Sequence, residues 1–120
     1  MSRWVGAGAG PTLGTWAFGL RGKVVVCVWY LRVAWSHEFA EEPVEIFSEV
    51  GADGYERRKV ERFRGGRLGW ADEKHEVGGT GLGVVPVPPL DEINAQQEFV
   101  ASEIDGDEFE QAWGPALGGK

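Results

Sequence analysis

Two histidines, each among carboxylates, are the residues of this sequence whose types and spacing could do chemistry. His37 lies in the stretch SHEFAEE together with Glu41 and Glu42, and His75 lies in the stretch ADEKHE. Histidine and carboxylate side chains bind zinc, and a histidine beside a glutamate can act as a general acid or base. The stretch HEFAE does not complete the H-E-x-x-H zinc signature, because its last residue is glutamate.

A glycine-rich stretch, HEVGGTGLGVVPVPP at 75–89, could in principle cradle a phosphate group. A dinucleotide fingerprint would need a third glycine where Val84 stands, and a P-loop would need lysine after Gly83. No lysine or arginine occurs from 75 to 119, so no local cation would neutralise a phosphate. We therefore interpret the stretch as a long connection from sheet to helix, and we expect no cofactor.

The charge is distributed unevenly along this acidic chain of net charge −7. Seven basic and four acidic residues occur in 54–74, whereas 75–119 holds nine acidic residues and no basic one. The overall field repels phosphate, so nucleic acid is not an expected partner. The basic stretch ERRKVERFRGGR is interpreted as a solvated pair of strands whose arginines meet the protein's own carboxylates, with Arg64 and Arg67 near Glu41 and Glu42.

The length of 120 residues suits one small domain. We expect a flexible glycine-rich extension over 1–23, with an upstream start codon as its origin, a folded domain over 24–114 and a flexible tail over 115–120. The uncharged stretch 4–20 is too short and too rich in glycine to span a bilayer. Cys27 is the only cysteine and is interpreted as a small buried hydrophobic residue, which agrees with a cytoplasmic location.

Four segments have the composition of β-strands. The first, VVVCVWYLRVAWSH at 24–37, places Leu31 and Val33 on one apolar face by its alternation. The others are 43–50, 55–64 and 67–73, separated by turns at 51–54 and 65–66. The two glycines at 65–66 suit a primed hairpin turn. Short connections predict antiparallel neighbours, with the 37–42 loop and the 65–66 turn at one end of the sheet and the 75–83 loop at the other.

Helical patterns occupy the C-terminal third. A short helical turn is expected over 88–95, and the segment 96–104 is ambiguous between strand and helix. A clearer helix begins after Asp105, which can cap it, and places Phe109, Ala112 and Trp113 on one stripe before Gly114 and Pro115 end it. The predicted fold is α+β, with an antiparallel meander of about four strands and a C-terminal helix on one face. His37 and His75 then lie at opposite ends of the sheet, about 20 Å apart, and cannot share one metal ion.

Several stretches in the same order resemble a bacterial family known only as domain of unknown function 6881. They are WYLRVAWSHEFAEEPVEIFSEV, YERRKVERFRGGRLGWADE, GGTGLG, PVPPLDEINAQQEF and EIDGDEFEQAW. The similarity covers roughly residues 29–113. It implies no activity, substrate or cofactor, because none is assigned to the family.

Two classes of function agree with these observations. The first is a non-enzymatic protein-interaction module, of the immunity or antitoxin type, that binds a basic protein through an acidic surface. The residues of that surface are Asp91, Glu92, Glu103, Asp107 and Glu110. The alternative is a small enzyme or metal-binding protein that uses His37 with Glu42. Small size, one-sided charge and an incomplete catalytic constellation favour the first class.

Overall fold

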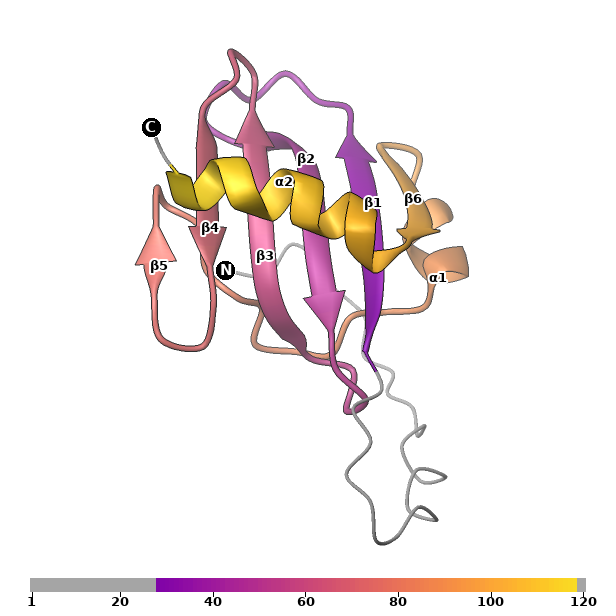
Figure 1. The fold of residues 1–120 in the computed structure, drawn as a ribbon. Helices are drawn as coiled ribbons and strands as arrows, with labels where there is room; N and C mark the ends of the chain where they lie inside the picture. Colours follow the sequence, from indigo (N-terminus) through magenta and orange to yellow (C-terminus); the bar gives the residue numbers. More distant parts are fainter. Residues whose placement is uncertain (1–27, 119–120) are drawn as a thin grey trace, which may run out of the picture.

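The computed structural model describes residues 28–118, which form one twisted sheet with helices on its two faces (Figure 1). In chain order the elements are β1 (Trp29–Trp35), β2 (Pro43–Val50), β3 (Glu56–Phe63), β4 (Leu68–Ala71), β5 (Glu76–Val77), α1 (Leu90–Asn94), β6 (Phe99–Ile104) and α2 (Gly106–Gly118). The predicted first strand is shorter than expected at its C-terminal end, where it stops at Trp35. Cys27 and the predicted extension over 1–23 lie outside the described residues.

The strands are all antiparallel and follow the order β5-β4-β3-β2-β1-β6. The α+β class, the antiparallel sheet and the C-terminal helix on one face are therefore confirmed. The sheet has six strands rather than about four, because two were not predicted. β5 is only two residues long, and the ambiguous segment becomes β6 by pairing with the distant β1, where Val33 lies opposite Ala101. Local periodicity carries no information about such a pairing.

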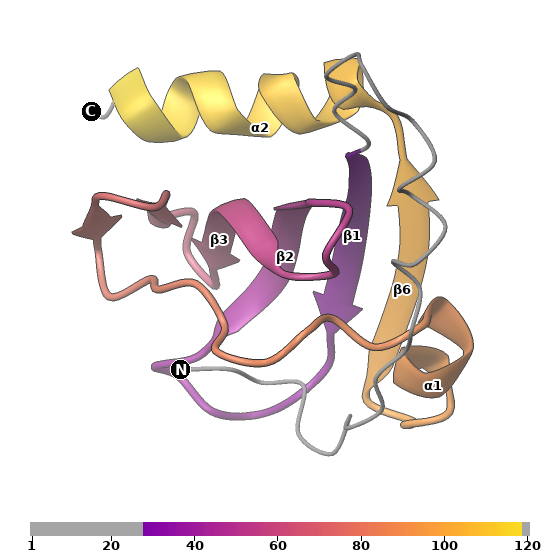
Figure 2. The same cartoon turned by 90° about the horizontal axis from the view of Figure 1, so that it is seen from below.

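The two faces of the sheet are covered by different segments (Figure 2). α2 lies across one face, where Phe109 and Trp113 pack with Val60 in one apolar cluster. On the other face, α1 and the chain between β5 and α1 cover a second cluster that includes Leu31, Val33, Ile46, Ile93, Phe99 and Ala101. The molecule therefore has three layers, with its sheet in the middle.

α2 begins where the sequence predicts but ends later. The backbone amide of Glu108 donates to Asp105 Oδ1 at 2.9 Å, so the predicted cap is present. The helix then continues through Gly114 and Pro115 to Gly118, and most of the predicted tail over 115–120 is helical. Ala116 is buried against the sheet. We attribute the longer helix to this packing, which offsets the one hydrogen bond that a proline in the last turns removes.

The hairpin between β3 and β4 has the predicted glycine turn. Gly65 and Gly66 both have positive φ, at 100° and 98°, as primed turns require. The connection after β5 differs from prediction, because it does not stay at one end of the sheet. It begins where Gly78 O accepts from Arg67, and it ends where Val87 donates to Gly54 O at 2.7 Å. It thus crosses the sheet from end to end.

Neither helix within residues 28–118 is long and apolar enough to span a bilayer. α2, the longer of the two, has 13 residues, whereas a spanning helix needs about 20.

Candidate functional site

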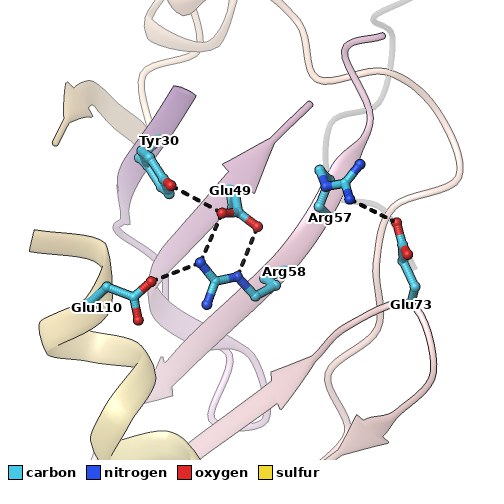
Figure 3. A network of polar contacts seen from close by, with 6 residues as sticks. All are labelled: Tyr30, Glu49, Arg57, Arg58, Glu73 and Glu110. Atoms are coloured by element: carbon cyan, nitrogen blue, oxygen red, sulfur yellow. Dashed lines mark hydrogen bonds and ion pairs between the residues drawn. The ribbon is translucent and has the colours of Figure 1, made fainter. Parts of the chain in front are cut away.

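A charged network joins α2 to the middle of the sheet (Figure 3). Arg58 on β3 donates two hydrogen bonds of 2.8 Å to the two carboxylate oxygens of Glu49 on β2. The same guanidinium donates to Glu110 on α2 at 2.9 Å, and Tyr30 on β1 donates its hydroxyl to Glu49 at 3.1 Å. Four elements are thereby held by one arginine and its partners. Arg57 points away from this network, toward an exposed glutamate.

Hydrogen bonding within this network, together with burial, shifts the pKa values of its members. Hydrogen bonds from Arg58 lower the pKa of Glu49 below its ordinary value, although burial acts in the opposite direction. Hydrogen bonding to Glu49 raises the pKa of Arg58, and burial followed by the bond to Glu49 raises the pKa of the Tyr30 hydroxyl. The Arg58 guanidinium also lies 4.8 Å from the ring centre of Phe109, a cation–π contact. The network therefore favours a charged pair and a neutral tyrosine.

A second charged group lies on the same face of the sheet. Glu45 on β2 is 7% exposed and accepts hydrogen bonds from Arg32 on β1 and Arg62 on β3, the latter at 2.7 Å. These arginines stand beside a pocket of about 330 Å³ between the sheet and α2. Its apolar lining consists of Phe47, Val60, Leu68, Ala112 and Pro115. The pocket is thus an apolar hollow whose polar wall consists of the two arginines, Glu108 and Gln111.

The opposite face holds a buried ion pair on β3. Lys59 Nζ lies 3.0 Å from Glu56 Oε1, and both side chains are almost fully buried. The glycine-rich connection completes the site, since Lys59 donates to Gly81 O at 3.1 Å and Gly83 N donates to Glu56 at 2.6 Å. Ser48 donates its hydroxyl to the other oxygen of Glu56. Buried charges are tolerated when they are paired and hydrogen-bonded in this manner.

The glycine-rich connection therefore binds the protein's own charges. Thr80 in this connection is buried and donates to Glu61 Oε1 at 2.9 Å. The prediction that the basic stretch is a solvated strand pair is wrong for Lys59 and Glu61, which are 1% and 0% exposed. Alternation on β3 directs these two side chains to the face that the connection covers. Burial by a loop distant in sequence is what the local pattern could not indicate.

His37 has one ring nitrogen engaged by the backbone of its own loop and the other by the backbone of Pro43, the first residue of β2. The amide of Phe39 donates to Nδ1 at 2.9 Å, so Nδ1 is the acceptor and Nε2 carries the proton. Nε2 lies 2.8 Å from Pro43 O, to which it donates. The ring also packs between Trp35 and Phe39. In this arrangement the imidazole orders the loop between β1 and β2 and offers no free nitrogen to a substrate or a metal.

His75 belongs to the turn between β4 and β5. Asp72 Oδ1 accepts from the amides of Lys74 and His75 and lies 3.0 Å from His75 Nδ1. The backbone hydrogen bond from Lys74 is the main cause that lowers the pKa of Asp72. His37 follows β1 and His75 precedes β5, so the two histidines lie at opposite ends of a sheet in which three strands stand between β1 and β5. Within residues 28–118, no three histidine, cysteine or acidic side chains are grouped to hold a metal ion.

Arg64 and Arg67, predicted to lie near Glu41 and Glu42, each donate to a backbone oxygen. Arg64 Nη2 donates to the backbone oxygen of His37 at 2.7 Å, so the loop after β1 and the glycine turn do lie at one end of the sheet. Arg67 stacks on the Phe63 ring, with 4.0 Å to its centre, and donates to Gly78 O. Carboxylates that bind arginines elsewhere include Glu45 and Glu49 on β2, Glu73 in the turn after β4 and Glu110 on α2.

The predicted acidic residues are exposed and lie around the β6 edge of the sheet. Asp91 and Glu92 are on α1, Glu103 is on β6, and Asp107 and Glu110 are on the first turns of α2. They occupy two faces, because Glu103 shares the face of Leu31, its partner on β1, whereas α2 covers the opposite face. Within residues 28–118, Glu110 is the one of these five acids that pairs with an arginine, Arg58. We use "acidic rim" for the exposed acids of 91–110: Asp91, Glu92, Glu98, Glu103, Asp105, Asp107, Glu108 and Glu110.

Sequence reasoning missed Glu45, Glu49 and Arg58 as members of charged groups. The sequence did contain one signal. Glu45 and Glu49 lie four residues apart and so share one face of β2, and Arg58 and Arg62 have the same spacing on β3. Antiparallel pairing of these strands sets Glu49 opposite Arg58 and Glu45 opposite Arg62. The pairing of β2 with β3 has one irregularity near each end of β2, and the sequence does not reveal either of them.

The chain belongs to the family described as domain of unknown function (DUF6881), whose model matches residues 29–118. This range is slightly longer than the predicted one and includes all six strands and both helices. No curated protein and no solved structure matches the chain.

Proposed function

We propose that this family member is a non-enzymatic interaction module that binds a basic protein through its acidic rim. The observation that carries the proposal is the charge of one continuous segment: residues 91–110 contain eight exposed acids and neither lysine nor arginine. Because α1, β6 and the start of α2 follow one another along the chain at one edge of the sheet, these charges lie along that edge and extend onto both of its faces.

The layout of charge supports recognition as well as solubility. Cations elsewhere in the described chain are largely engaged by the protein's own carboxylates, as Arg58, Arg32 and Arg62 show. In the acidic rim, Glu110 is the one acid that pairs with a cation within residues 28–118. An unneutralised acidic surface attracts a basic partner over a distance and speeds its encounter more than it deepens affinity.

The form of this function that we propose is neutralisation of a basic target, as immunity and antitoxin proteins perform it. Small size and one-sided charge are the supporting features. We further propose the cytoplasm as the compartment, because the chain has a single cysteine.

The test is capture from a lysate of the native host, followed by kinetics with the purified basic protein that is captured. Glu92→Gln, Glu103→Gln and Asp107→Asn are combined in one variant, which spares Glu110 and its bond to Arg58. We expect the association rate to fall about tenfold or more, and to fall also for the wild type as salt shortens the Debye length below about 10 Å.

The matched control replaces Glu38, Glu41 and Glu73 with glutamine. These three acids are also exposed, and the change in net charge is the same. The control variant should keep an association rate close to that of the wild type. An equal fall in association rate in both variants would mean that net charge alone causes the effect. A partner whose binding needs Arg57 or Arg64 would refute the acidic rim as the binding surface.

A further inference from the structure

We propose that the pocket between α2 and the sheet binds a small organic monocarboxylate, with its carboxylate on Arg32 and Arg62 and its apolar body under α2. This site shares Glu108 with the acidic rim but otherwise uses other residues, and it can be tested without any protein partner. The pocket volume of about 330 Å³ falls at the lower end of the range for small-molecule sites.

The two arginines are held in place before any ligand arrives. Glu45 is buried between them, accepts a hydrogen bond from Nε of each side chain and forms an ion pair with Nη2 of each, so both guanidinium groups are fixed in orientation. Among residues 28–118 no acceptor contacts Nη1 of Arg32 or Arg62. Their side chains are 41% and 44% exposed, which leaves these donors open to a ligand. Pre-ordered donors of this kind reduce the entropy lost on binding.

The floor of the pocket requires an apolar group on the ligand. Phe47 and Val60 come from the sheet, and Ala112 and Pro115 come from α2. Ala112 is the small residue of the helix stripe that faces the sheet, next to the much larger Trp113, and it leaves the space open. An inorganic anion would leave this surface in contact with water, so an aromatic or short aliphatic body is the better match.

The charges around the pocket favour one negative charge on the ligand. Two arginines and Glu45 together carry one net positive charge. Glu108 on the rim of the pocket is exposed and adds a screened negative charge. A monocarboxylate balances the single positive charge of the two arginines and Glu45, whereas a phosphate dianion would exceed it in a protein of net charge −7.

The experiment is a titration of the full ¹⁵N-labelled chain with phenylacetate, followed by amide chemical shifts. We expect saturable changes at millimolar phenylacetate, centred on Arg32, Arg62 and Ala112. Phenylacetamide has the same shape without the charge and should bind about tenfold or more weakly, as loss of a charge-assisted hydrogen bond implies. Equal binding of the two probes, or tighter binding of inorganic phosphate, would overturn the carboxylate assignment.

Two variants locate the site by different means. Arg62→Gln removes one guanidinium and should weaken phenylacetate binding about tenfold. Ala112→Leu keeps both arginines and fills the pocket, so it should abolish binding. Arg57 is an exposed arginine of the same strand that does not line the pocket. The variant Arg57→Gln should therefore bind phenylacetate as tightly as the wild type does. The amide spectrum of each variant verifies its fold, and unchanged binding in folded Ala112→Leu would refute the pocket as the site.

Discussion

The carboxamide of Asn94 pairs with both backbone groups of Ala101. Nδ2 of Asn94 donates to Ala101 O at 3.0 Å, and Ala101 N donates to Asn94 Oδ1 at 2.7 Å. Ala101 lies in the middle of β6, the strand at one edge of the sheet. The side chain thus takes the place that a neighbouring strand would occupy, and it covers an edge that could otherwise pair with another molecule.

Asn94→Ala should destabilise the protein and promote its self-association. Two buried backbone groups lose their partner, which we expect to cost about 1–3 kcal/mol in the free energy of unfolding. Urea denaturation measures this loss, and sedimentation at increasing protein concentration measures association. The control is Gln97→Ala, which removes an exposed amide side chain after the same helix. It should change neither the free energy of unfolding nor the degree of association. A monomeric Asn94→Ala protein of wild-type stability would contradict this role of Asn94.

Glu49→Gln should change how stability depends on pH. The pKa of Glu49 is lowered in the folded protein, chiefly by the hydrogen bonds from Arg58. A carboxylate of this kind stabilises the fold above its unfolded pKa of about 4.3, and the contribution is lost as pH falls through the folded pKa. Urea denaturation should therefore show the variant about 1–3 kcal/mol less stable near pH 7, with a smaller difference at acid pH.

Glu38→Gln is the matched control for the pH experiment. Glu38 is exposed and lies in the loop after β1, so its replacement should leave the stability difference near zero at every pH. A Glu49→Gln protein whose stability falls with acid as steeply as that of the wild type would show that other carboxylates account for the acid sensitivity.

Lys59→Met should destabilise the fold strongly, because it leaves Glu56 buried beside an apolar side chain. Breaking a buried pair in this way typically costs about 3–5 kcal/mol. Adding Glu56→Gln removes the charge that was left behind, and the double variant should be more stable than Lys59→Met alone. Thermal and urea denaturation of the four proteins in this cycle give the coupling energy. Additive losses would mean that the two side chains do not act as a pair.

Two glycine-to-alanine substitutions should change the stability of the protein in opposite directions. A Cβ at Gly69 on β4 would lie 2.3 Å from the buried Thr80 Oγ1 and 3.0 Å from Gly78 O. Backbone would have to move, so Gly69→Ala should lose about 1–3 kcal/mol. At Gly114 on α2 a Cβ meets nothing within 4 Å, and Gly114→Ala should gain about 0.5–1 kcal/mol from reduced chain entropy. Melting temperatures measure both, and a stable Gly69→Ala protein would refute the close approach of the connection to β4.

The sequence by itself determined the elements whose cause is local. Alternation in β1 follows from burial of one strand face, and Leu31 and Val33 are both fully buried. The glycine pair at 65–66 specifies its turn because positive φ is easy only for glycine. Asp105 caps α2 because its oxygen can reach an amide three residues later. Short connections then made the neighbouring strands antiparallel.

Only the tertiary structure decided the features that depend on contacts between distant segments. β6 became a strand because β1 had an open edge, and α2 passed Pro115 because Ala116 could pack against the sheet. Lys59 became a buried ion rather than a solvated one because a connection beyond β5 covers it. The same residue types in the same order would be solvated without that cover. Burial depends on what lies on top of a residue, and local periodicity records only the face on which the residue lies.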